Sequence, residues 1–421
     1  MREPLDDGLR KHEITVWFST IVMFLLGLNL PRSSTFLALV LVAGCWTCRR
    51  DIKFALGSPL VRVLISCLAL FGISFSVRQL QLGYWEHNAQ SIPDLVSYTI
   101  FPSACLLFGF SARQRCIGRS GVSAAAIAFA VGGLVYVLLA LAITRHSWWS
   151  LADLASSGVT VPWSPHGQFS QNVRSVEQRA FPAVILLSCV PLLFAQRQFL
   201  WRLKILLCLV VGGMAFCALW LLDGRLFYVP LVLSLAPYVF MARQRFLRWL
   251  VIASSMICVV IGLRSQFLCD ERFPMQLAFL KYIPSFPWGG RQISFDFKGC
   301  LPQQRFHFGP PPSDLHLPHN IFLDVINDVG IVPAFFLAVA ALISLFVIVR
   351  VFLLTTRSRT WDPGQMLRFG LVAAMISQAM WQPFLYSDQL MFMLTFLLTG
   401  VMLAESRDAI YSNASRAVPL R

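Results

Sequence analysis

The sequence predicts an all-α integral membrane protein of about twelve transmembrane helices, with two long outer loops that contain short interfacial helices. Two observations lead to this fold class. Of the 421 residues, 57% are hydrophobic and only 13% are charged, whereas a soluble domain carries roughly 25% charged residues. Apolar segments of roughly 15–25 residues also recur along the whole length. We therefore expect residues 1–421 to form a single polytopic membrane domain.

The apolar segments give the expected transmembrane spans. These are 14–30, 35–48, 60–77, 93–110, 122–144, 180–195, 205–222, 226–240, 249–263, 330–349, 369–386 and 389–404. The first span lacks a small-residue cleavage site before the second, so we expect a retained helix and not a removed signal peptide.

The basic residues set the orientation of these spans. Most of the 35 Lys and Arg residues stand in short connections on one side, namely 2–11, 49–53, 113–119, 197–204, 243–248, 350–368 and 407–421. Short cytoplasmic connections carry such an excess, so both termini are expected in the cytoplasm. The formal charge of +15 is explained in the same way and does not indicate nucleic acid binding.

The opposite, outer side carries the two long loops, 145–179 and 264–318, both rich in Trp, Pro, Phe and Gly. Loops of this length are usually functional or disordered. Six of the seven histidines fall on this side, all but His12, and so do arginines that depart from the cytoplasmic bias. The arginines are Arg174, Arg179, Arg225, Arg264, Arg272, Arg291 and Arg305. Such a group suggests binding of an anion outside the cytoplasm.

Most of the cysteines lie within expected spans, where they are interpreted as small apolar packing residues. Cys269 and Cys300 instead share the second outer loop, where an oxidising periplasm would permit a disulfide. Sequence does not supply the Cα separation that decides this pairing. The outer loops show no metal-ligand spacing, since Pro318 interrupts the pair His316 and His319. We therefore expect no metal and no cofactor.

The stretch from Leu317 to Gly330 carries the most information about function. Asn320 is a competent N-cap residue, and apolar residues follow at helical spacing, with Asp324 and Asp328 on another face. Gly330 marks a break before a long apolar run. The pattern predicts a short amphipathic helix on the outer interface, so that loop and helix together cover 264–329. For a lone histidine such as His319, anchoring this helix is the commoner role.

This stretch resembles the motif of the O-antigen ligase family, whose membrane enzymes join undecaprenyl-diphosphate-linked polysaccharide to the lipid A core. The family carries His, then Asn, Ser or Gln, nine residues, Gly, two residues, and Gly, Thr or Tyr. Here His319 and Asn320 are followed, after nine residues, by Gly330, and the last position is Pro333. The expected topology, with a late, long outer loop that ends in the motif, is also similar to that of the family.

A second resemblance concerns an arginine at the outer start of a span, which the family usually places in a Ser-Arg-Gly turn. This chain has Asp223-Gly224-Arg225-Leu226. Arg225 could instead extend to the interface or pair with Asp223. Arg174, Arg264 and Arg291 are further candidates to bind the donor diphosphate, and each could equally be an interfacial anchor.

The resemblance implies a metal-independent, inverting glycosyltransferase of the bacterial inner membrane, with a periplasmic active site. His319 would be the base and Arg225 a second catalytic residue, supported by Asn320, Asp223, Asp324 and Asp388. The partners would be undecaprenyl-diphosphate-linked O-antigen, the lipid A-core oligosaccharide and membrane lipids. An O-antigen polymerase or a protein O-oligosaccharyltransferase would use the same donor. A transporter or flippase is disfavoured, because no internal repeat is found.

Overall fold

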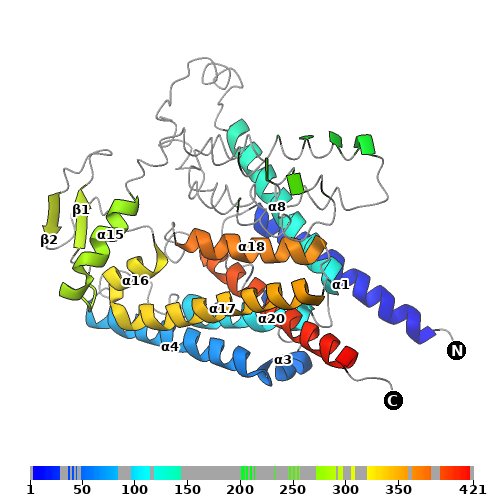
Figure 1. Ribbon diagram of the computed structural model, residues 1–421, viewed down its shortest axis with the longest axis horizontal. Helices are drawn as coiled ribbons and strands as arrows, with labels where there is room; N and C mark the ends of the chain where they lie inside the picture. Colours follow the sequence, from blue (N-terminus) through cyan, green and yellow to red (C-terminus); the bar gives the residue numbers. More distant parts are fainter. Residues whose placement is uncertain are drawn as a thin grey trace. The chain divides into compact units, whose positions relative to one another are not determined.

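A computed structural model describes residues 3–28, 49–83, 96–113, 118–143, 272–290, 293–296, 305–308, 320–358, 363–380 and 389–417, with scattered positions within 37–44 and 201–256. The described residues are almost entirely helical (Figure 1). The chain divides into two compact units. Unit 1 comprises Met1–Leu37, Cys116–Phe267 and Trp361–Ala374, and unit 2 comprises Ala38–Arg115, Leu268–Thr360 and Met375–Arg421.

Described helices occur at seven of the twelve expected spans, and α3 lies instead in an expected cytoplasmic connection. They are α1 (Glu3–Gly27), α3 (Arg49–Leu56), α4 (Pro59–Gln81), η1 (Val96–Ile100), α7 (Phe101–Ser111), α8 (Gly118–Ile143), α17 (Ile331–Ser358), α18 (Pro363–Ala379) and α20 (Gln389–Ala417). The expected spans at 35–48, 180–195, 205–222, 226–240 and 249–263 lie outside these described elements.

Two of the described helices, α4 and α17, are long and apolar enough to cross a membrane. Three shorter apolar helical stretches accompany them, at Thr15–Gly27, Val96–Ser111 and Gly121–Val135. The start of α4 follows from its sequence, since Pro59 occupies the first turn, where a missing backbone N–H costs no helical hydrogen bond. The count of about twelve spans remains a prediction.

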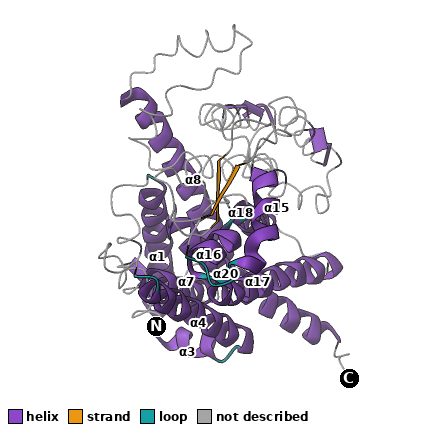
Figure 2. Ribbon diagram, turned by 90° about the vertical axis from the view of Figure 1, so that its left-hand side faces the viewer, coloured by secondary structure: helices purple, strands orange, loops and turns teal. Residues whose placement is uncertain are grey.

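The second long outer loop contains a short helix, as the sequence predicted, and two strands that it did not predict. The described part of the loop includes α15 (Arg272–Tyr282) and a 3-10 turn, Ile283–Ser285. Two short strands, β1 (Ile293–Asp296) and β2 (Arg305–Phe308), then pair in antiparallel register (Figure 2). Apolar and polar residues alternate in both strands, which is typical of strands, but four residues are too few for this pattern to stand out within a loop.

The core of unit 2 combines an aromatic cluster with a close helix crossing. The rings of Phe75 and Tyr98 lie 5.0 Å apart, and Phe392 of α20 lies 6.4 Å from Tyr98. Nearby, α7 and α20 cross at two glycines, where a Cβ on Gly109 would overlap the carbonyl oxygen of Leu397. The same holds for Gly400 and the carbonyl of Leu106. Small residues let the two backbones approach this closely.

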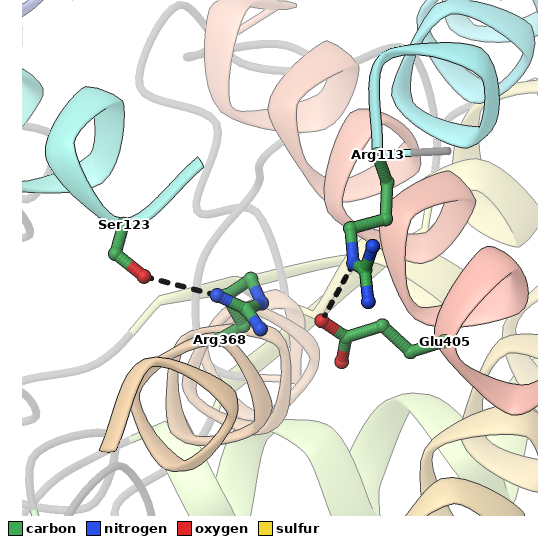
Figure 3. A network of polar contacts seen from close by, with 4 residues as sticks. All are labelled: Arg113, Ser123, Arg368 and Glu405. Carbon is green, nitrogen blue, oxygen red and sulfur yellow. Dashed lines mark hydrogen bonds and ion pairs between the residues drawn. The ribbon is translucent and has the colours of Figure 1, made fainter. Parts of the chain in front are cut away.

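Each unit also contains a buried arginine that the sequence analysis had placed in a cytoplasmic connection (Figure 3). In unit 2, Nε of Arg113 lies 3.3 Å from Oε1 of Glu405, and both side chains are buried. In unit 1, Nη1 of Arg368 donates a 2.9 Å hydrogen bond to Oγ of Ser123. Helix α18 begins at Pro363, ahead of the expected span 369–386. Arg368 therefore lies within the helix and not in a connection, and its side chain is buried.

The crossing of α7 and α20 predicts that Gly400→Ala destabilises the protein. The added methyl group would overlap the Leu106 carbonyl, and overpacking of this kind typically costs about 1–3 kcal/mol. Thermal unfolding of the detergent-purified variant measures the loss. Gly213→Ala is the control, because a Cβ there meets nothing within 4 Å. Equal melting temperatures for Gly400→Ala and the unmodified protein would contradict the crossing.

Candidate functional site

The candidate motif is centred on the short helix α16 (Ile321–Val329). Asn320 stands before it in an extended conformation, with φ −138° and ψ 122°. Its Oδ1 accepts hydrogen bonds from the backbone N–H groups of Phe322 (3.0 Å) and Leu323 (3.3 Å). These donors have no partner within the helix, so the side chain of Asn320 stabilises its first turn. The predicted N-cap is confirmed.

The amide nitrogen of Asn320 makes a second, longer-range contact. Its Nδ2 donates a 3.1 Å hydrogen bond to the carbonyl oxygen of Met380, the residue that follows α18. Nε2 of Gln276, on α15, donates to the same oxygen, also at 3.1 Å. The side chain of Asn320 therefore caps the first turn of α16 and also links it to the residue that follows α18.

The other end of α16 is formed by Gly330, as the sequence predicted. Gly330 adopts φ 101° and ψ 177°, a backbone region that is essentially restricted to glycine. Its N–H donates to the carbonyls of Val325 (3.2 Å) and Ile326 (3.0 Å), and α17 begins at the next residue. Pro333, where the motif departs from the family pattern, lies in the first turn of α17 and costs it no hydrogen bond.

A turn from the second outer loop, Pro287–Gly290, packs against this junction. The carbonyl of Pro287 accepts a 2.8 Å hydrogen bond from the N–H of Ile331, and the N–H of Gly290 donates to the carbonyl of Asp328 at 3.0 Å. A Cβ on Gly330 would lie 2.9 Å from the carbonyl carbon of Trp288. The turn and the helix junction therefore fit together only without a side chain at Gly330.

The polar face of α16 is turned inward. Asp324, Asn327 and Asp328 are all buried, with Asp324 only 1% exposed. The partly exposed positions are the apolar Phe322 and Ile326. Four apolar residues are buried as well, so the helix is covered on most sides, whereas the sequence predicted a helix on the outer interface; they are Ile321, Leu323, Val325 and Val329. Polar faces that turn inward are typical of membrane proteins, where apolar residues face lipid. Asp324 also lies in the first turn, where the helix dipole favours a carboxylate.

Arg78 contributes to this site and was missed by the sequence analysis. It lies half-buried near the end of α4, a helix that contacts α16 and lies below it in Figure 1. Its Nε donates to the carbonyl of Val329 (3.3 Å) and its Nη2 to the carbonyl of Trp288 (2.5 Å). Its guanidinium carbon stands 6.0 Å from the centre of the Trp288 ring. The available signal was its position directly after the expected span 60–77, on the outer side.

Of the residues proposed from the sequence, Asn320 and Asp324 lie within the described structure, on one helix. The others lie outside the described residues. They are His319, Arg225, Arg174, Arg264, Arg291, Asp223, Asp388, Cys269 and Cys300. Among the described residues, no group of three or more His, Cys, Asp or Glu could hold a metal ion.

Comparison with known proteins adds no family assignment. The chain matches no protein-family model, and no curated protein is significantly similar to it. The resemblance to O-antigen ligases therefore rests on the motif and on the topology expected from the sequence.

The conformation of Gly330 predicts a strong response to Gly330→Ala. The substitution combines a disallowed backbone conformation, which costs about 1–3 kcal/mol, with contacts of 2.9–3.0 Å to the Pro287–Gly290 turn. We expect a clearly lowered melting temperature. Gly83→Ala is the matched control, since Gly83 also has a positive φ, 70°, but a Cβ there meets nothing within 4 Å. A smaller loss at Gly330 than at Gly83 would contradict the packing of this junction.

The two roles of Asn320 can be separated by two substitutions. Asn320→Ala removes the cap and the bond to Met380, and loss of an N-cap alone costs about 0.5–2 kcal/mol. Asn320→Ser retains a capping oxygen, so we expect it to recover most of that stability in thermal unfolding. If serine were as destabilising as alanine, the hydrogen bond to Met380, and not the cap, would provide most of the stability that Asn320 contributes.

Proposed function

We propose that this protein is an O-antigen ligase: a metal-independent, inverting glycosyltransferase that moves polysaccharide from undecaprenyl diphosphate to a sugar hydroxyl of the lipid A core. In this proposal about twelve helices cross the bacterial inner membrane, both termini are cytoplasmic, and the site faces the periplasm. The donor carries its own activation, so no cofactor is required.

The observation that carries the proposal is that the motif coincides with the helix α16. Asn320 and Gly330 match two positions of the family pattern, and they are the residues that begin and end α16. The apolar helix α17, long enough to cross a membrane, follows directly. His319 precedes the cap, so any side chain at that position is attached to a helix whose start is fixed by three hydrogen bonds. Such support suits a catalytic group, which must be held in place.

The proposed reaction is a single displacement. The acceptor hydroxyl oxygen attacks the anomeric carbon of the donor sugar, and the bond from that carbon to the diphosphate oxygen breaks. His319 takes the hydroxyl proton, a role suited to its unperturbed pKa of about 6.5. Undecaprenyl diphosphate leaves with the bonding electron pair, and arginine side chains stabilise its growing negative charge. Arg225 is the first candidate, with Arg174, Arg264 and Arg291.

The described residues have supporting roles in this scheme. The amide of Asn320 is engaged with Phe322, Leu323 and Met380, so Asn320 positions its neighbour and does not bind substrate. The burial of Asp324 places its carboxylate inside the protein. Its role is to support the helix from within, while contact with the sugars falls to residues nearer His319.

The test is replacement of His319 in cells that lack their own ligase. We expect His319→Ala to reduce attachment of long polysaccharide to the lipid A core by at least about 100-fold, the lower end of what a general base contributes. His12→Ala, at the one histidine expected on the cytoplasmic side, should leave attachment unchanged. Protein levels are compared by immunoblot. Normal capping of the core by His319→Ala would remove this histidine from the mechanism.

The lipid that accumulates in the inactive variant separates the related activities. Long-chain donor lipid indicates a ligase, and single repeat units indicate a polymerase. Glycosylated protein in the active strain indicates an oligosaccharyltransferase. A transporter or flippase would instead leave the donor on the cytoplasmic side of the membrane.

A further inference from the structure

We propose that Arg78 is a positioning residue for the proposed transfer reaction: it holds the Pro287–Gly290 turn against the α16–α17 junction and so fixes the helix that follows His319. This inference rests on the proposed function. Arg78 would act through α16 and would not contact the substrates.

The first argument is the set of partners of the guanidinium group. Nε donates to the carbonyl of Val329, at the end of α16, and Nη2 to the carbonyl of Trp288, in the turn. Nη1 donates to Oε1 of Gln81 at 2.5 Å. One planar group therefore connects three segments of unit 2: the end of α4, the outer-loop turn and the end of α16. A cation is also favourable at a helix C-terminus, where carbonyl groups lack helical partners.

The second argument is that Arg78 bonds to the same two segments, the turn and the junction, that backbone hydrogen bonds already join. The turn and the junction already share the bonds from Ile331 to Pro287 and from Gly290 to Asp328. Arg78 adds charge-assisted bonds to the residue next to each of these, Trp288 and Val329. Trp288 is 61% exposed, so little of it is buried against the junction. The hydrogen bond from Arg78 to its carbonyl is therefore a main attachment of this residue.

The third argument is that the short helix α16 connects the junction at its end to Asn320 at its start. The helix has nine residues, with Asn320 fixed at its start and the junction fixed at its end. A rigid helix of this length transmits a shift at one end to the other. Displacement of a catalytic group by about 1 Å can cost about 100-fold in rate. Release of the junction is therefore expected to slow the chemical step. Of the candidate donor-binding arginines, only Arg291 directly follows the released turn, so we expect a smaller effect on donor binding.

The test is steady-state transfer by the full-length protein in lipid nanodiscs, with purified polysaccharide-diphosphate lipid as donor and core lipid as acceptor. Arg78→Lys keeps the charge but removes the planar fork that serves several carbonyls at once. We expect kcat to fall at least about tenfold, and KM for the donor to rise by a smaller factor, because Arg291 is the only candidate diphosphate-binding arginine that directly follows the released turn. Arg62→Lys, the same change at an exposed position of α4, should leave both constants unchanged.

A second variant disturbs the same contact from the other side and covers the case in which Arg78→Lys does not fold. A Cβ on Gly289 would lie 2.6 Å from the backbone nitrogen of Gly330 and 2.8 Å from the carbonyl oxygen of Asp328. Gly289→Ala leaves Arg78 in place and should produce a similar fall in kcat, again larger than any rise in KM for the donor.

The outcomes separate this inference from the function on which it rests. If the unmodified protein transfers and Arg78→Lys keeps its kcat, the positioning role is overturned. A raised KM for the donor at unchanged kcat would also overturn it, because the effect of Arg78 would then lie in donor binding and not in the chemical step. If the unmodified protein transfers nothing under these conditions, the proposed function fails first, and the positioning role fails with it.

Discussion

The junction between α16 and α17 is the constraint on which the rest of the site depends. Gly330 turns the chain through a conformation that only glycine adopts readily. The absence of a side chain there lets the Pro287–Gly290 turn donate and accept two backbone hydrogen bonds across the junction. A short helix is marginal by itself, so α16 needs such attachments at both ends. Asn320 provides them at the start, and the turn with Arg78 provides them at the end.

Parts of this arrangement follow from the sequence because they depend on local chemistry. Asparagine before an apolar helical pattern predicts a cap, and glycine before an apolar run predicts a break; both are confirmed. The contacts of Arg78 could not be predicted in this way, since its partners lie 210 and 251 residues away along the chain. The burial of Asp324, Asn327 and Asp328 could not be predicted either, because periodicity separates the faces of a helix but does not say which of them are covered.

The burial of two arginines also could not be predicted from the sequence. Arg113 and Arg368 stood among basic residues that indicated cytoplasmic connections, yet both are buried and bonded to polar side chains within their units. Charge counts along a sequence describe which side of a membrane a connection occupies. They do not distinguish a solvated arginine from one that the helices enclose. For the arginines assigned to the donor diphosphate, such as Arg225, the same distinction decides between a ligand contact and a structural bond.

We propose that this chain joins a lipid-diphosphate-linked polysaccharide to the lipid A core without a metal or a nucleotide. Transfer by the purified, unmodified protein in nanodiscs tests this proposal, with EDTA present and with donor and acceptor as the only added reactants. We expect core lipid of increased mass together with released undecaprenyl diphosphate, in equal amounts. Donor lipid that grows longer while the core lipid stays unchanged would contradict it.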